Sequence, residues 1–333
     1  MHGVTLLLVV VVLLAVVFDY INGFHDTANA IATSVATRAL HPRQAIVMAA
    51  AFNFIGAFAG TAVAKTIGSG LVQETTTTQA VVIAALIGAI AWNLVTWSAG
   101  LPSSSSHGLI GGLLGATLVA AGTGAFKVDG IVGKVIIPMI VSPLIGFLGA
   151  FGLMLAIYWI FRRAKRRPLG RAFRRIQVLS AGFMAFSHGS NDAQKTMGII
   201  TLALFTAGVI PDVSVPVWVI VTSATALSLG TAIGGWRIMR TMGHRVVDLE
   251  PVHGFVAETT SASILFATAH FGIPVSTTHV ISSAIMGVGT SRGARGVRWG
   301  VAGNILVAWL LTLPAAALFA GAAWIVLRLV GIE

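Results

Sequence analysis

The sequence contains no cysteine, and this absence excludes a disulfide framework, a thiolate nucleophile and a cysteine-ligated metal site. Charge is also scarce: charged residues make up 9% of the 333 residues, whereas they make up about a quarter of ordinary soluble domains. So few charged side chains cannot cover the surface of a soluble fold of this length. With 56% hydrophobic residues and a mean hydropathy of +0.92, the chain is predicted to be an all-α, polytopic integral membrane protein.

Signatures of catalysis are missing as well. The sequence has no Walker A motif for a nucleotide and no H-E-x-x-H motif for a catalytic zinc ion. Ser106 and His107 cannot act as a Ser–His pair, because adjacent residues of a helix do not face each other. We therefore expect neither an enzyme nor a primary pump.

Apolar stretches of membrane-spanning length recur along the chain and predict about 10–12 membrane segments. They lie at 4–21, 44–64, 79–98, 136–160, 216–235, 251–270 and 299–327, with further apolar segments at 24–38, 102–121, 193–208 and 274–290. The first stretch has the length of a signal-peptide core, but no Lys or Arg precedes it, so we expect a retained helix. Residues 162–175 carry eight Lys or Arg and no acid, which predicts a cytoplasmic loop.

The orientation follows from threading the chain outward from this basic loop. Both termini are then predicted to lie outside the inner (plasma) membrane, and 16 of the 21 Lys and Arg residues fall on its cytoplasmic side. Lys195 remains within the membrane. The net charge of +11 therefore reports orientation in the lipid bilayer, and we expect no nucleic acid partner.

Two pairs of motifs repeat in the same order at nearly the same distance. The pairs are Gly23–Asp26 (GFHD) with Gly189–Asp192 (GSND), 166 residues apart, and Leu101–His107 (LPSSSSH) with Ile273–His279 (IPVSTTH), 172 residues apart. We therefore predict two repeats, 1–161 and 176–333, joined by the basic loop 162–175. Because the first repeat crosses the membrane an odd number of times, the second is inverted, as in secondary transporters with broken helices.

A run of hydroxyl side chains follows the proline of each later motif. Pro102 and Pro274 favour a helix start, where Ser or Thr caps the first turn. A re-entrant half-helix that starts inside the bilayer presents free N–H groups and a partial positive charge to an oxyanion. The predicted anion-binding hydroxyls are those of Ser103, Ser104, Ser105, Ser106, Ser276, Thr277 and Thr278. The alternative is that these hydroxyls only hydrogen-bond neighbouring helices.

The earlier motifs place a carboxylate in an apolar segment, at Asp26 and at Asp192. An intramembrane carboxylate is costly and usually has a partner and a function. The motif glycines predict unwound segments whose carbonyls, with carboxylate and amide oxygens, hold Na⁺; otherwise the acids carry protons. The predicted coupling-ion residues are Asn22, Asp26, Asn29, Asn191, Asp192 and Glu258, with Na⁺ assigned to Asp26 and Asp192. The alternative is a structural cap or an Asp–Lys pair.

Lys195 breaks the symmetry of the repeats, because its counterpart is Asn29. An ammonium group in the place of a bound ion supplies a fixed positive charge. This favours H⁺ over Na⁺ as the coupling ion, or fewer bound Na⁺ ions. Alternatively, Lys195 contacts the anion directly, and Gln194 is assigned with it to the anion site.

Glu258 and four motif histidines have two interpretations each. Glu258 is either linked to the coupling ion or solvated near the cytoplasmic end of its segment. The histidines either relay protons or are structural imidazoles with satisfied hydrogen bonds; they are His25, His107, His188 and His279.

Together these motifs resemble the inorganic phosphate transporter (PiT) family, which has a duplicated Gly-x-x-Asp signature and hydroxyl-rich Pro-(Ser/Thr)-His motifs. The signatures here are Asn22–Thr33 and Ser187–Gly198, and His188–Lys195 (HGSNDAQK) is similar to the bacterial low-affinity branch. The resemblance implies uptake of inorganic phosphate, free or as a metal–phosphate complex, driven by Na⁺ or H⁺ and with no further cofactor. It implies that Asp26 and Asp192 are the ion-linked acids and that the hydroxyl runs bind phosphate, and it is compatible with a homodimer.

Two other functions stay open at this point. Some relatives in this family carry sulfate, which is tetrahedral and similar in size to phosphate. Phosphate near neutral pH can donate a hydrogen bond, so carboxylates beside the hydroxyl motifs favour phosphate over sulfate. An anion channel also uses half-helices, but it does not need paired buried aspartates in inverted repeats.

Overall fold

The computed structural model describes residues 2–332, and the side chains of all of these except 2–5 and 166. They form a bundle of helices, in which Val72 and Phe126 make an isolated β-bridge. The first half contains α1 (His2–Ala36), α2 (Pro42–Gly56), α3 (Ala62–Ser69), α4 (Gln79–Ala99), α5 (Ser105–Ala121), α6 (Val128–Ile131) and α7 (Ile137–Ile160). The second half contains α8 (Arg166–Thr206), α9 (Val217–Ile233), α10 (Trp236–Arg240), α11 (Pro251–His270), α12 (Thr277–Thr290) and α13 (Trp299–Leu329).

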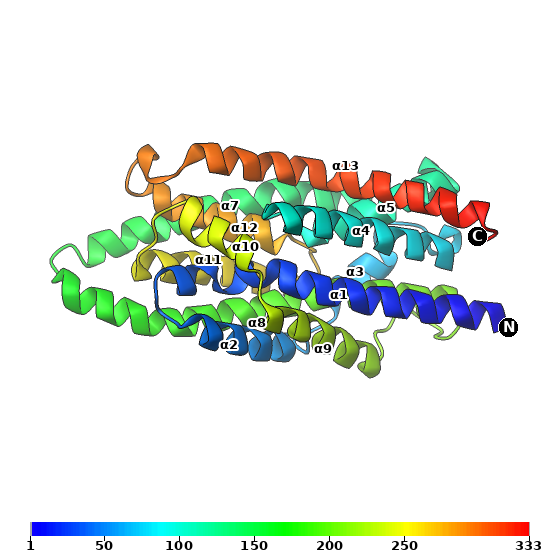
Figure 1. Cartoon of the computed structure of the whole chain (residues 1–333), viewed down its shortest axis with the longest axis horizontal. Helices are drawn as coiled ribbons and strands as arrows, with labels where there is room; N and C mark the ends of the chain where they lie inside the picture. Colours follow the sequence, from blue (N-terminus) through cyan, green and yellow to red (C-terminus); the bar gives the residue numbers. More distant parts are fainter. Residues whose placement is uncertain (1, 333) are drawn as a thin grey trace.

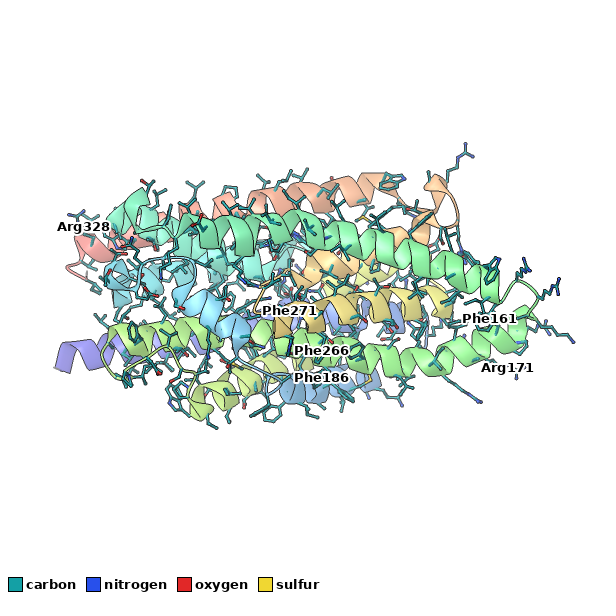
Figure 2. The ribbon with its side chains drawn as sticks, turned by 180° about the vertical axis from the view of Figure 1, so that it is seen from behind. Phe161, Arg171, Phe186, Phe266, Phe271 and Arg328 are labelled. Carbon is teal, nitrogen blue, oxygen red and sulfur yellow. The ribbon has the colours of Figure 1, made fainter. Side chains whose placement is uncertain are left out.

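The two halves run in opposite directions through the bundle. Helix α1 begins at the end where both termini lie, whereas α8 begins at the opposite end (Figure 1). Arg171, in the basic segment, and Arg328, near the C-terminus, mark these two ends in Figure 2. The helices of the halves correspond in order: α1, α2–α3, α4, α5 and α7 match α8, α9–α10, α11, α12 and α13. The predicted fold class, an inverted repeat of broken helices, is confirmed.

Several helices have the length and composition of membrane spans. Among the described residues, four segments are each long and apolar enough to cross a membrane, namely Leu6–Ala36, Gln79–Ala99, Val128–Ile160 and Trp299–Leu329. A fifth consists of Val217–Ile233 and Trp236–Arg245, which bend by 60° at their break. Helices α5 and α12 have 17 and 14 residues, too few to cross about 30 Å of hydrocarbon at about 1.5 Å per residue. They are the half-helices that the sequence predicts.

The helix breaks predicted at the two Gly-x-x-Asp motifs are not there. The breaks lie between α2 and α3 and between α9 and α10. Helices α1 and α8 run through their Gly-x-x-Asp motifs without interruption, so the expected unwound segments there are wrong. The motif glycines instead allow close helix packing. A Cβ atom on Gly23 would lie 2.3 Å from the Leu227 carbonyl oxygen in α9, and one on Gly189 would lie 2.2 Å from that of Asn53 in α2. Small residues let backbones approach in this way in membrane bundles.

The basic segment is mostly helical, and this corrects its prediction as a loop. Residues 161–163 form a turn, and α8 begins at Arg166. Phe173 on this part of α8 is buried, while Arg171 and Arg174 are exposed. One apolar face against the bundle and one charged face outward are enough to continue the helix beyond the apolar segment.

Helices α5 and α12 begin where the hydroxyl motifs predict. The Ser104 hydroxyl accepts a hydrogen bond from the His107 backbone N–H, and the Ser276 hydroxyl accepts one from the His279 N–H, both at 3.1 Å. Helix α5 packs against α13, and α12 packs against α7. Each half-helix is therefore held by a helix of the other half, and the His107 and His279 rings meet at 4.7 Å between centroids.

We expect Gly189→Ala to destabilise the protein, because the added methyl group meets backbone atoms of α2 that cannot rotate aside. Overpacking of this kind costs about 1–3 kcal/mol and should lower the midpoint of thermal unfolding in detergent. Gly152→Ala in α7 is the matched control, since nothing lies within 4 Å of a Cβ atom at that position. An equal midpoint for the two variants would contradict close packing of α2 on α8.

Candidate functional site

A buried group of charged and hydroxyl side chains lies where α1 and α8 meet the first turns of α5 and α12. Its charged members are Asp26 on α1 and Asp192 and Lys195 on α8, and each is at most 2% exposed. We call these three residues, with the hydroxyls and amides that contact them, the central cluster. Ionised groups at this depth need partners, because their burial without compensation is costly.

The Lys195 ammonium group joins three helices. It donates hydrogen bonds to Asp192 Oδ1 at 2.5 Å, to the Val275 carbonyl oxygen at 3.1 Å and to the Ser106 hydroxyl. An ammonium group has three N–H donors, so all of them are used. Lys195 therefore ties α8 to the starts of both half-helices, and the Asp–Lys pair that the sequence left as an alternative is present.

The second oxygen of Asp192 faces two further groups. Its Oδ2 lies 3.3 Å from His188 Nε2 and accepts a hydrogen bond from the Thr277 hydroxyl at 3.4 Å. His188 Nδ1 lies 3.1 Å from the Asn53 side-chain oxygen. Asp192 is therefore the better compensated of the two aspartates.

Asp26 is connected to the start of α5. Its Oδ1 lies 2.7 Å from His25 Nδ1, and His25 Nε2 lies 3.0 Å from the Thr96 hydroxyl. The Ser103 hydroxyl donates to Thr96 at 2.8 Å, and the Ser105 hydroxyl lies 3.5 Å from His25 Nδ1. The first hydroxyl motif thus reaches Asp26 through a histidine.

Asn29 makes the corresponding link from α1 to the start of α12. Its side-chain N–H groups donate to the Thr278 hydroxyl at 2.9 Å and to the Thr277 hydroxyl at 3.3 Å. The predicted hydroxyl residues therefore divide into two groups. Ser104 and Ser276 cap the half-helices, while the others contact the central cluster directly or through His25, Thr96 or Asn29.

Several buried polar atoms around the cluster have no hydrogen-bond partner among the described residues. They are Oδ2 of Asp26, Oδ1 of Asn22 and of Asn29, and both polar side-chain atoms of Asn191. Buried polar atoms without partners are costly, and in native proteins they usually mark a ligand, an ion or a functional group. These free acceptors, with one free amide donor on Asn191, fit a site that receives a ligand or ion.

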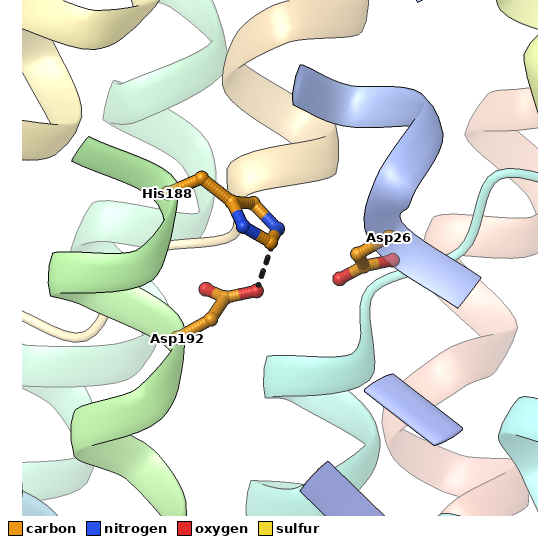
Figure 3. A group of neighbouring side chains, drawn as sticks. All are labelled: Asp26, His188 and Asp192. Carbon is orange, nitrogen blue, oxygen red and sulfur yellow. Dashed lines mark ion pairs between the residues drawn. The ribbon is translucent and has the colours of Figure 1, made fainter. Parts of the chain in front are cut away.

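Asp26, His188 and Asp192 face one another across α1 and α8 (Figure 3). One possible ligand atom of each lies within 4.8 Å of the others, which makes this group a candidate cation site. Carboxylate oxygens suit a hard cation, whereas imidazole is a softer ligand. Lys195 already compensates Asp192, so the group fits a proton or one cation at Asp26 better than several Na⁺ ions.

Gln194 lies outside the central cluster, although it was assigned to the anion site. Its side-chain oxygen accepts a hydrogen bond from the Val63 N–H at 2.8 Å, and its amide N–H donates to the Ser190 carbonyl oxygen at 2.6 Å. The side chain thus caps the first turn of α3. Neither of these hydrogen bonds reaches a hydroxyl motif.

Glu258 on α11 is fully buried, so its interpretation as a solvated residue is wrong. It accepts hydrogen bonds from the Thr33 hydroxyl at 2.6 Å, the Gln177 amide at 3.0 Å and the Ser180 hydroxyl at 2.5 Å. These partners are neutral and lie on α1 and α8. Glu258 therefore forms a second buried acidic site, separate from the central cluster.

Asp19 is a further buried acid, which the motifs do not mark. Its Oδ1 accepts a hydrogen bond from the Thr196 hydroxyl at 2.6 Å, next to Lys195 in the chain. A helical spacing of three or four residues was the signal that could have found it, because such positions share one face of a helix. The polar face of α1 consists of Asp19, Asn22, Asp26, Asn29 and Thr33.

An inverted repeat of broken helices around a buried polar site is the architecture of secondary transporters, and this chain has that architecture. A model of the Phosphate transporter family matches residues 22–172 and, in a second match, residues 162–320. The chain belongs to this family and is a multi-pass membrane protein. The resemblance drawn from the motifs is confirmed.

The relatives agree with this family over nearly the whole chain. The probable low-affinity inorganic phosphate transporter of Bacillus subtilis is 47% identical over 328 residues, 98% of each chain. The protein of the same name from Rhizobium meliloti is 50% identical over 314 residues, 94% of each chain. A solved structure described as the sodium-dependent phosphate transporter is 26% identical, with a TM-score of 0.90 over 97% of this chain and 99% of the other. The prediction of a transporter, and not an enzyme, agrees with these names.

We expect Lys195→Met to be strongly destabilising, because it leaves the buried Asp192 carboxylate without its nearest cation. Removal of one partner of a buried ion pair costs about 3–5 kcal/mol. The double variant Lys195→Met/Asp192→Asn removes both charges and should recover most of that stability, as measured by thermal unfolding in detergent. Lys65→Met, at an exposed position, is the control. Equal losses in the single and double variants would contradict the ion-pair interpretation.

Proposed function

We propose that the protein is a secondary active transporter that takes up inorganic phosphate by alternating access, driven by a cation gradient in which H⁺ is the favoured ion. The observation that carries this proposal is the convergence of two Ser-capped helix starts on the buried Asp26–Asp192 group, between inverted halves. The names of the relatives, probable low-affinity inorganic phosphate transporters, support phosphate as the substrate.

The starts of α5 and α12 form the proposed phosphate site. Each supplies backbone N–H groups and a partial positive charge of about half a unit. The hydroxyls that contact the central cluster or its neighbours can exchange their present hydrogen bonds for bonds to phosphate oxygens; they belong to Ser103, Ser105, Ser106, Thr277 and Thr278. Lys195 balances negative charge beside them.

The free oxygen of Asp26 supports phosphate over sulfate. Asp26 Oδ2 is buried and has no partner among the described residues, so it can accept a hydrogen bond from a substrate. Phosphate near neutral pH carries a hydroxyl that donates such a bond, whereas sulfate has only acceptors. A sulfate permease of the same family is the second candidate.

Charge balance in the central cluster favours H⁺ as the coupling ion. Two aspartates and one ammonium group leave a negative charge, so an arriving phosphate anion needs at least one further positive charge. A proton on Asp26, shared with His25 at 2.7 Å, or a proton on His188 meets this need. Na⁺ at Asp26 is the alternative, and the description of the solved neighbour as sodium-dependent supports it.

Glu258 is assigned to the coupling ion as a second proton carrier. It is fully buried, and its three described hydrogen-bond partners are neutral. A neutral carboxyl is less costly than a carboxylate in such surroundings. Because α1 and α8 both continue from the central cluster to the partners of Glu258, the two sites are linked by the same pair of helices.

The end of the bundle that carries the basic segment is assigned to the cytoplasm, by the positive-inside rule. Both termini lie at the opposite end (Figure 1) and are assigned to the outside of the plasma membrane. This orientation makes transport toward the basic end uptake.

Phosphate uptake into proteoliposomes is expected to persist without Na⁺ and to follow an inward proton gradient. Lys195→Asn restores the residue of the counterpart position. It is expected to make both uptake and the thermal stability of the protein depend on Na⁺, because Na⁺ then takes the place of the ammonium group beside Asp192. Labelled phosphate, with each gradient imposed separately, measures both effects on uptake, and thermal unfolding with and without Na⁺ measures the stability. Strict Na⁺ dependence of the unaltered protein would overturn H⁺ coupling.

Counterflow of labelled phosphate separates a carrier from an anion channel. Unlabelled phosphate on the far side is expected to accelerate labelled influx, because the loaded site returns faster than the empty one. Arsenate, which also carries a hydroxyl, should compete strongly and sulfate weakly, with empty liposomes as the control. Influx that ignores far-side phosphate would support a channel, and equal competition by sulfate would support a sulfate permease.

A further inference from the structure

Two cavities of the same size, each about 330 Å³, lie at equivalent places in the two halves. The first, here called the arginine cavity, lies beside the α9–α10 break and the end of α4; its lining includes Ser98, Gly100, Trp236, Arg237, Arg240 and Arg245. The second, the opposite cavity, lies beside the α2–α3 break and the end of α11; its lining includes Gly60, Lys65, Ser190, Gln194, Ala269 and His270.

Both cavities border a loop that leads into a hydroxyl motif. Gly100 and Gly272 stand in these loops two residues before the motif proline, and both have a φ of +66°. The Thr241 hydroxyl donates to the Gly100 carbonyl oxygen at 3.0 Å, and the Thr66 hydroxyl donates to that of Gly272 at 2.7 Å. In each broken helix, the segment after the break is therefore hydrogen-bonded to a loop that leads into a half-helix: Thr241 to the loop before α5, and Thr66 to the loop before α12.

The two cavities differ in the amount of positive charge, because the basic residues that line the opposite cavity are Lys65 and His270. Three arginines and no acid line the arginine cavity, and Arg240 and Arg245 have no ion-pair partner among the described residues. The acids of the neighbouring loop are engaged elsewhere, since Glu250 pairs with Arg292 at 2.6 Å and Asp248 pairs with Arg298 at 2.9 Å. The arginine cavity thus presents uncompensated positive charge directly beside the first hydroxyl motif.

A pair of aromatic rings lies beside this cavity and meets edge to face. The Arg237 guanidinium lies 5.4 Å from the Trp97 ring centroid, and the Trp97 ring lies 5.3 Å from that of Phe24, two residues before Asp26. At the corresponding positions of the second half stand Ala269 and Ser190, which both line the opposite cavity. Bulky rings therefore stand beside the arginine cavity, where the opposite cavity has small residues.

We infer that the arginine cavity is a second anion-binding site, which holds inorganic phosphate between the central cluster and the solution at the basic end of the bundle. This inference rests on the proposed phosphate transport and adds a place on its route. Positive charge in a concave site concentrates an anion by long-range attraction.

The transport test removes charge from the cavity. Arg240→Gln/Arg245→Gln is expected to raise the KM for phosphate presented at the basic end, roughly three- to tenfold. This KM should also depend less on salt concentration than that of the unaltered protein. The KM for phosphate presented at the other end should not change. Arg43→Gln/Arg174→Gln is the matched control, because both residues are exposed at the basic end and neither lines this cavity. Membrane vesicles of the two orientations give the two KM values. Equal KM values for the two double variants would overturn the inference.

The binding test uses the absence of native cysteine. Ser98→Cys places one thiol in the lining of the arginine cavity, and a membrane-impermeant maleimide labels it from the basic end. Inorganic phosphate is expected to slow this labelling when Arg240 and Arg245 are present, and to leave it unchanged in Arg240→Gln/Arg245→Gln. Protection that persists without these arginines would come from the central cluster and would overturn the inference.

The proposed function fails separately from this inference. If the unaltered protein shows no phosphate counterflow, phosphate transport itself is wrong, whatever the labelling shows. If counterflow is normal but the arginine variants match their control in KM and in protection, only the second anion site is wrong. Thermal unfolding of each variant confirms that the changes at these exposed positions leave the fold intact.

Discussion

The compensation of buried charge is the constraint on which the rest of this structure depends. Asp192 and Lys195 are completely enclosed within a helix bundle, so each requires the other, and their 2.5 Å contact meets that requirement. The ammonium group has two further N–H donors, and these reach the Ser106 hydroxyl and the carbonyl oxygen before Ser276. One side chain thereby fixes the two half-helix starts relative to the acids. The geometry of the proposed phosphate site follows from this one residue.

Duplication determines where the parts lie, and departures from it determine their chemistry. The same glycine contacts, the same Ser caps and the same Thr-to-glycine hydrogen bonds occur in both halves. Within this frame, Lys195 stands opposite Asn29, and Trp97 stands opposite Ala269. The first difference places a fixed charge on one side of the central cluster. The second places a bulky ring beside the arginine cavity, where the opposite cavity has a methyl group.

The misplaced helix breaks show why local sequence is ambiguous in a membrane protein. Glycine near a buried acid is compatible with an unwound segment, but it is equally compatible with a backbone that passes within van der Waals contact of another helix. Gly23 and Gly189 serve the second purpose, and α1 and α8 stay helical. The partner atoms belong to Leu227 and Asn53, far away in the sequence. Nothing near the glycines distinguishes the two cases, because the deciding contact is tertiary.

The sequence by itself determined the membrane class, the duplication, the starts of α5 and α12, and the family, because hydropathy, repeat spacing and Pro-Ser caps are local properties of the chain. It also marked Asp26, Asp192 and Lys195 as charges within apolar segments, and the structure buries all three. Only the tertiary structure decided which groups the other polar residues contact. It shows that Gln194 caps α3, that Glu258 is buried apart from the central cluster, and that Asp19 joins the polar face of α1. The physical reason is that side-chain direction and burial depend on helices that pack from the other half of the chain.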